Sequence, residues 1–152
     1  MPESHWSSLF PLLRWLGYGG LLPFAALAVG SLLITEPGVR SQCLMLLKIY
    51  GLSIISFVGA LSWGFALVHP DCDLALRRRL LLWSVLPSLV GCASFVLPSS
   101  SGCLVLAVTA ALALAVDLRT ATTLGLPQAW RSLRVHLSLG AIAALGVGAL
   151  SA

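Results

Sequence analysis

Charged side chains are scarce in this chain. Only 9% of its 152 residues are Asp, Glu, Lys or Arg, whereas 59% are hydrophobic and the mean hydropathy is +1.00. Soluble globular domains carry about 25% charged residues, so the composition excludes that class and indicates an integral membrane protein. The net charge of +4 is balanced by anionic lipid at the cytoplasmic face, and no nucleic-acid partner is needed to explain it.

The chain also has few of the residues that build metal or catalytic sites. Its four cysteines form no CxxC pair, and its three histidines show no ligand spacing. Acidic residues are few and the serines follow packing spacings or lie in loops, so no Ser-His-Asp arrangement is supported. We therefore expect no metal, no cofactor and no catalytic residue. A disulfide between Cys43 and Cys103, which are predicted near the same membrane face, stays an open alternative.

Long apolar runs dominate what is present. Five of them come close to the roughly 20 residues that cross about 30 Å of hydrocarbon. They predict an all-α bundle of five transmembrane helices in a single domain, residues 1–152, with helices over residues 15–34, 49–68, 80–97, 102–118 and 130–150. The fourth run is short and rich in alanine, so it either spans the membrane fully or is tilted against its neighbours.

The basic residues are distributed unevenly between the two predicted membrane faces. Arg40 and Lys48 lie on one side, and seven arginines lie on the other: Arg14, Arg77, Arg78, Arg79, Arg119, Arg131 and Arg134. Because Lys and Arg are retained on the cytoplasmic side during insertion, this asymmetry predicts a cytoplasmic N-terminus and a C-terminus outside.

Small residues recur at helical spacings in three of the predicted helices. Helices in lipid are held together by close approach of their backbones and by interhelical hydrogen bonds, so small residues mark contacts. The second helix offers a packing or partner face that comprises Ser56, Gly59, Ala60, Trp63 and Gly64. Packing within the bundle is one interpretation of this face, and docking on another membrane protein or on a second copy is the other.

Two prolines interrupt the apolar runs. Pro23 in WLGYGGLLPF, residues 15–24, cannot donate to the carbonyl of Gly19, so we predict a kink with a free carbonyl there. Pro87 has the same effect behind Trp83 in the third helix. Broken helices at matching depth are typical of transporter substrate sites, which makes Gly19, Pro23, Trp83 and Pro87 a candidate small-solute site.

The absence of charge argues against transport. No Asp, Glu, Lys or Arg occurs in residues 16–34, 49–68, 80–97 or 103–116. Ion-coupled transport normally needs an ionisable group within the membrane, so the sequence lacks the usual machinery.

The richest polar region is residues 117–134. Asp117 closes the fourth helix, and Arg131 and Arg134 stand one turn apart on the fifth. We predict that Asp117 pairs with Arg134, or else with Arg131, across the hairpin at the membrane boundary. Snorkelling of both arginines to lipid phosphates is the alternative. An enzyme acting on lipids through Asp117, His136 and the arginines is a third functional class.

Four segments carry a family resemblance: LGYGGLLPF at 16–24, YGLSIISFVGALSWGFAL at 50–67, LPSLVG at 86–91, and Asp117 with GLPQAWRSLRVHLSLG at 125–140. In these the chain resembles the transmembrane-protein-69-like family, also called domain of unknown function 3429. The family tends to have a second glycine where Ala60 stands and an aromatic pair where Ala129 and Trp130 stand. The resemblance implies a small protein of the bacterial plasma membrane or the mitochondrial inner membrane, and it supplies no activity, cofactor or catalytic residue.

From these observations we expect a non-enzymatic accessory or assembly subunit that docks on a larger membrane complex. The runner-up is a small-solute carrier that uses the paired proline kinks.

Overall fold

The computed structural model describes residues 3–152, with side chains from Ser8 onward. It is helical throughout, with no strand in this part of the chain: α1 (Glu3–Gly19), α2 (Leu21–Leu33), α3 (Pro37–Val68), α4 (Leu74–Ala93), the 3-10 helix η1 (Ser94–Val96), α5 (Ser99–Thr123) and α6 (Gln128–Ser151). Five segments are long and apolar enough to cross a membrane, and α1 and α2 together make the first of them. The predicted all-α bundle of five membrane helices is therefore confirmed.

The helices extend beyond the apolar runs. α3 begins at Pro37, where the Glu36 carboxylate accepts a hydrogen bond from Gly38 N at 3.0 Å and proline occupies the first turn. Its 32 residues are about 48 Å long, which exceeds the hydrocarbon thickness of about 30 Å. α5 has 25 residues and is long enough to span fully. At α3 the capping residue Glu36, rather than the edge of the apolar run, thus marks where the helix begins.

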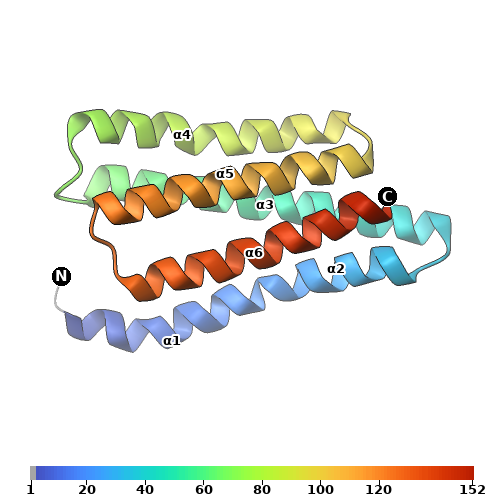
Figure 1. Cartoon of the computed structure of the whole chain (residues 1–152), viewed down its shortest axis with the longest axis horizontal. Coiled ribbons are helices and arrows are strands. Elements are labelled where there is room, and N and C mark those ends of the chain that lie inside the picture. The colour runs from blue at the N-terminus through green and yellow to red at the C-terminus, as the bar shows by residue number, and fades with distance from the viewer. Residues whose placement is uncertain (1–2) are drawn as a thin grey trace.

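α3, α5 and α6 lie in the middle of the bundle, with α4 on one side of them and α1 and α2 on the other. α4 packs against α3 and α5, whereas α2 packs against α3 and α6. In Figure 1, α4 and the α1–α2 pair accordingly lie at opposite edges of the bundle. The start of α1, the α3–α4 turn and the α5–α6 turn lie at one end, and the C-terminus, the α2–α3 connection and the α4–α5 connection lie at the opposite end.

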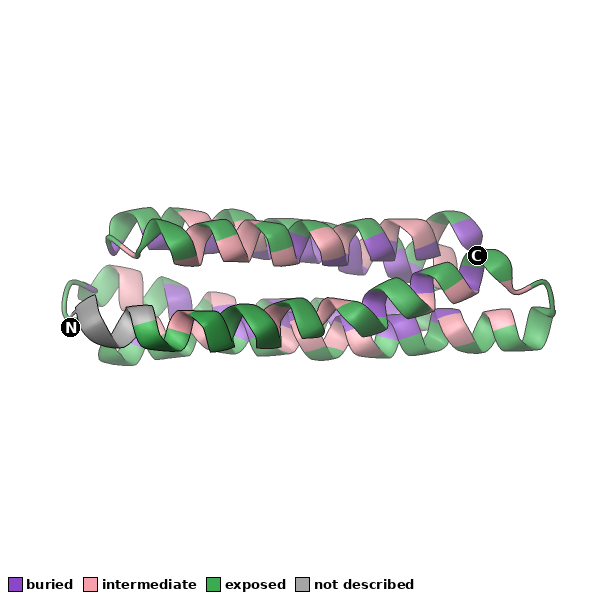
Figure 2. Ribbon diagram, turned by 90° about the horizontal axis from the view of Figure 1, so that it is seen from below, coloured by how far each residue is buried: buried purple, intermediate pink, exposed green. Residues whose placement is uncertain are grey.

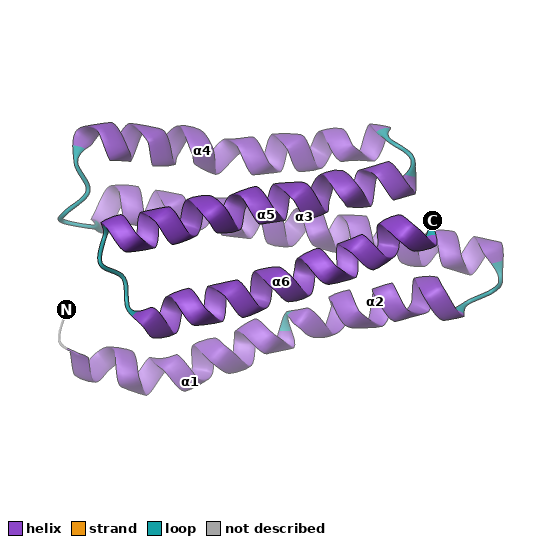
Figure 3. Ribbon diagram, in the orientation of Figure 1, coloured by secondary structure: helices purple, strands orange, loops and turns teal. Residues whose placement is uncertain are grey.

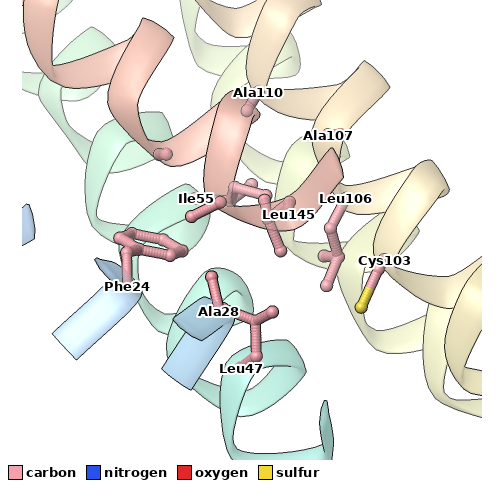
Figure 4. Close-up of a cluster of buried hydrophobic side chains, with 11 residues drawn as sticks. Phe24, Ala28, Leu47, Ile55, Cys103, Leu106, Ala107, Ala110 and Leu145 are labelled. Carbon is pink, nitrogen blue, oxygen red and sulfur yellow. The ribbon is translucent and has the colours of Figure 1, made fainter. Parts of the chain in front are cut away.

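The core lies where α2, α3, α5 and α6 meet. Phe24, Leu47, Leu106 and Leu145 are almost fully buried there, and Figure 4 shows their side chains pointing toward one another. The Phe24 ring meets Tyr50 edge to face with centroids 4.8 Å apart. Burial is concentrated on the inward faces of these helices, while α1 stays largely exposed along its described length (Figure 2).

Polar side chains close two helix ends. Arg77, on the first turn of α4, donates to the carbonyl oxygens of Ala66 at 2.7 Å and His69 at 3.1 Å, so it caps the C-terminus of α3. At the other end of the bundle, Ser100 donates to Ala149 O at 2.7 Å, and Arg40 donates to Ser151 O. These bonds satisfy carbonyls that have no partner within their own helix.

Most of the small-residue positions serve the bundle itself. A β-carbon at Gly91 would lie 2.6 Å from Leu52 Cδ1, and one at Gly148 would lie 2.5 Å from Leu47 Cδ2. A side chain at either position would have to displace the end of the facing leucine, so these glycines allow α4 and α6 to pack closely on α3.

Candidate functional site

The predicted partner face on α3 divides into two halves. Gly59 is buried against α4, where a β-carbon would lie 2.6 Å from the carbonyl oxygen of Ser84. The indole N–H of Trp63 also donates to Ser84 Oγ, although 51% of the Trp63 residue stays exposed. Ala60 and Gly64 are exposed, and a β-carbon at Gly64 would meet nothing within 4 Å. Ser56 lies half-buried between these halves.

Gly59 therefore belongs to an intramolecular contact and is not free for a partner. The interpretation that assigned one docking role to the whole stripe is wrong for this residue. Gly59 and Gly64 are five residues apart, which is about 140° around a helix, so they point to different surroundings.

The kink predicted at Pro23 is present. α1 ends at Gly19 and α2 begins at Leu21, and this break is visible in Figure 3. Tyr50 Oη on α3 donates to the carbonyl oxygen of Gly20 at 2.8 Å. The carbonyl that we expected to be free was that of the preceding residue, Gly19. Gly19 itself is exposed, and a β-carbon there would meet nothing within 4 Å.

The second proline does not join the first in a common site. α4 continues as an α-helix through Pro87, which is buried near Gly59 on α3. Trp83 is half-buried on the same helix. Because α4 and the α1–α2 pair lie at opposite edges of the bundle, Gly19 and Pro23 are separated from Trp83 and Pro87 by the core helices (Figure 1). The small-solute site that we predicted from the paired kinks is therefore not assembled.

The hairpin between α5 and α6 contains an ion pair. Arg134 Nε donates to Asp117 Oδ2 at 2.7 Å, and the two side chains are 11% and 5% exposed. This is the first of the two pairings expected from the sequence. Arg131 makes no ion pair with the described residues, and its Nε is buried without a partner among them. His136 contacts Tyr18 of α1, with 3.1 Å between Nδ1 and the phenolic oxygen, so it does not extend the pair into a catalytic arrangement.

A long apolar cavity lies beside this ion pair. It has a volume of about 490 Å³ and is lined by residues of α1, α2, α3, α5 and α6. Arg134 and Ser138 are the polar side chains in a lining that is otherwise apolar apart from the indole of Trp130. The cluster of Figure 4 forms its inner end, because Phe24 and Leu145 belong to both. The ion pair and the cavity together are the most developed candidate site among the described residues.

Lys48 is the residue that sequence reasoning misplaced. It was expected outside the membrane, ahead of the second helix, but it lies inside α3 and is only 3% exposed. Its Nζ donates to Leu97 O at 3.3 Å and lies 4.9 Å from the centre of the Phe95 ring. A β-carbon at Gly102 would lie 2.7 Å from Nζ, so that glycine makes room for the ammonium group.

Lys48 has no carboxylate partner among residues 8–152. Lys48 is therefore a buried charge that was not expected from the sequence, whereas the Asp117–Arg134 pair was expected. The misplacement has a physical cause: hydropathy alone starts the helix at residue 49, whereas the Glu36 cap starts it at Pro37.

The cysteines are free thiols and do not form the disulfide considered above. Cys43 faces Gly30 of α2, where a β-carbon would lie 3.2 Å from its Sγ, and Cys103 faces Gly148 of α6. No group of three or more His, Cys, Asp or Glu residues gathers in the described part of the chain.

Comparison with known proteins gives one match. A family model described as "Protein of unknown function (DUF3429)" matches residues 10–150. No curated protein and no solved structure matches the chain.

Proposed function

The chain belongs to the DUF3429 family, and we propose that it is a non-enzymatic accessory or assembly subunit of a larger complex in the bacterial plasma membrane or mitochondrial inner membrane. The observation that carries this proposal is a notch on the outer surface of α3 at Ala60 and Gly64. Both residues are exposed, and no other helix of the described chain covers Gly64.

The notch leaves room for a neighbouring helix to approach α3 closely. Gly64 leaves the α3 backbone accessible, and small residues allow two helix backbones to approach closely in lipid. Phe57 and Trp63, which are 66% and 51% exposed, stand beside it as large side chains against which a second helix can pack. Two other glycines of α3, Gly51 and Gly59, are already used inside the bundle.

The occupant of the notch is a transmembrane helix of another subunit or of a second copy of this chain. A Leu at position 64 would fill the notch, and its β-carbon would meet no other part of the described chain within 4 Å. The matched control is Gly146 of α6, because a β-carbon there also meets nothing within 4 Å. Both substitutions place the same side chain on an open helix surface, but only the first lies in the notch.

The experiment is purification of tagged wild-type, Gly64→Leu and Gly146→Leu protein from the native membrane in mild detergent, with quantitative mass spectrometry of every co-eluting chain. We expect a partner in fixed proportion with the wild type and with Gly146→Leu, and its loss with Gly64→Leu. If Gly64→Leu keeps its partners, or if both variants lose them equally, the notch is not the docking site.

The proposed orientation places the N-terminus in the cytoplasm or the mitochondrial matrix. The charge asymmetry supports it more strongly once Lys48 is assigned to the bundle interior, because Arg40 is then the basic residue left at the other end. Arg78 and Arg79 are exposed at the end that carries the α3–α4 turn, where anionic lipid is the expected contact.

A further inference from the structure

The apolar cavity is long and narrow. Along α6 it is lined from Trp130 to Leu145, a distance of about 22 Å at 1.5 Å per residue. A cavity of about 490 Å³ that extends over this length has the shape of one extended hydrocarbon chain.

The cavity is open to the side where α1 leaves the rest of the bundle. α1 packs chiefly against α2 and α6, and the described part of it is mostly exposed. Leu16 of α1 and Phe57 of α3 both line the cavity, and each is 66% exposed. A lipid chain can thus enter between α1 and α3 directly from the bilayer.

One end of the cavity is cationic. Arg134 lines it, and only its Nε is used by Asp117, although a guanidinium group has five N–H donors. No further hydrogen bond joins this guanidinium to the described residues. Arg131 stands one turn earlier with its Nε buried and unpartnered within residues 8–152. Arg131 does not line the cavity itself, and Asp117 pairs with Arg134 alone, so one carboxylate stands against two arginines and this end carries a net positive charge.

We propose that this cavity binds one anionic phospholipid of the surrounding bilayer. One acyl chain occupies the apolar length of the cavity up to the cluster of Phe24 and Leu145. The phosphate lies at the Trp130 end, where the free guanidinium donors of Arg134 and the side chain of Arg131 bind it. Arginine forms charge-assisted hydrogen bonds with phosphate oxygens, and an anion removes the excess positive charge that Asp117 leaves uncompensated.

The test is a lipid titration of the purified full chain followed by native mass spectrometry, with dioleoyl phosphatidylglycerol and dioleoyl phosphatidylcholine as the probes. We expect one phosphatidylglycerol to bind at least about tenfold more tightly than phosphatidylcholine. Equal binding of the two lipids, or binding without a saturable single site, would overturn the proposal.

Two arginine variants test the headgroup contact. Arg134→Lys keeps a cation beside Asp117 but removes the planar set of donors, and Arg131→Gln removes the second charge. Each should lower the affinity for phosphatidylglycerol about tenfold and leave phosphatidylcholine unchanged. The matched control is Arg78→Gln, an exposed arginine at the same end of the bundle but outside the cavity, which should bind as the wild type does. If Arg78→Gln has the same effect as the other two, the preference arises from general surface charge and the proposed site is wrong.

A third variant tests the chain-binding length. Ala113 is 2% exposed and lines the cavity, so Ala113→Phe places a ring where the acyl chain would lie. It should lower the affinity for both lipids. Thiol protection of Cys72 and Cys103, which are 4% and 0% exposed, shows whether this variant is folded. If it is folded and binds phosphatidylglycerol as the wild type does, the chain is not in this cavity. If it is unfolded, the arginine variants still decide the question.

Discussion

Replacing Gly59 by alanine is the sharpest test of how this bundle is held together. The β-carbon of the new residue would lie 2.6 Å from the carbonyl oxygen of Ser84, and an ordinary contact begins at 3.4 Å. α3 and α4 would therefore have to separate by about 0.8 Å at this point. Ser84 also accepts the hydrogen bond from Trp63, so the same displacement weakens that contact.

The expected loss follows from three contributions. Inserting a group into a closely packed contact costs about 1–3 kcal/mol, and weakening a neutral hydrogen bond costs about 0.5–1.5 kcal/mol. The higher helix propensity of alanine returns about 0.5–1 kcal/mol. We therefore expect Gly59→Ala to lower the free energy of unfolding by about 0.5–4 kcal/mol.

Gly64→Ala is the matched control. It makes the same chemical change on the same helix, but the new β-carbon meets nothing within 4 Å. Only the propensity gain applies, so this variant should be as stable as the wild type or more stable by up to about 1 kcal/mol.

Unfolding by SDS, followed through thiol labelling, measures both variants. Cys72 and Cys103 are buried and become reactive when the bundle opens, whereas the exposed Cys92 and the half-buried Cys43 are first replaced by alanine. The SDS concentration at the midpoint of labelling should fall for Gly59→Ala and stay constant or rise for Gly64→Ala. A Gly59→Ala midpoint equal to or above that of the wild type would refute the close α3–α4 contact.

Three further predictions concern the buried charges and the orientation. Lys48→Met should leave the SDS concentration at the unfolding midpoint unchanged or raise it. A buried ammonium group without a carboxylate partner costs more to desolvate than its single hydrogen bond returns. A clear drop of the midpoint would mean that Lys48 holds the α4–α5 connection in place. In detergent without anionic lipid, Asp117→Asn should destabilise the protein by about 3–5 kcal/mol, measured by the same SDS titration, because it leaves Arg134 buried and without a counter-charge. A loss below about 1 kcal/mol in that detergent would show that water already compensates this arginine. The orientation can be tested with single cysteines in a background without the native cysteines. Asp71→Cys should be protected from a membrane-impermeant thiol reagent added outside, and Thr35→Cys should be labelled by it. The reverse pattern would invert the orientation predicted from the arginines.

Much of the architecture was predictable because it depends on local sequence. Apolar runs of membrane-spanning length define the helices, and the first span is interrupted at Gly20, next to the carbonyl of Gly19 to which Pro23 has no N–H to donate. The same residue type does not interrupt α4, which continues through Pro87. The Asp117–Arg134 contact joins residues 17 positions apart across one short turn, so helix periodicity and turn length bring them together.

The tertiary structure alone decided which faces are used and what lies between them. Gly59 and Gly64 are the same residue type on one helix, and only the position of α4 makes the first a buried contact and the second an open notch. Lys48 is buried because a carbonyl oxygen 49 residues away accepts its hydrogen bond. The cavity lies between α1 and α3, because α1, which precedes the break at Gly20, diverges from α3. Each of these depends on how helices distant in sequence pack in space, which the spacing of residues along one helix does not determine.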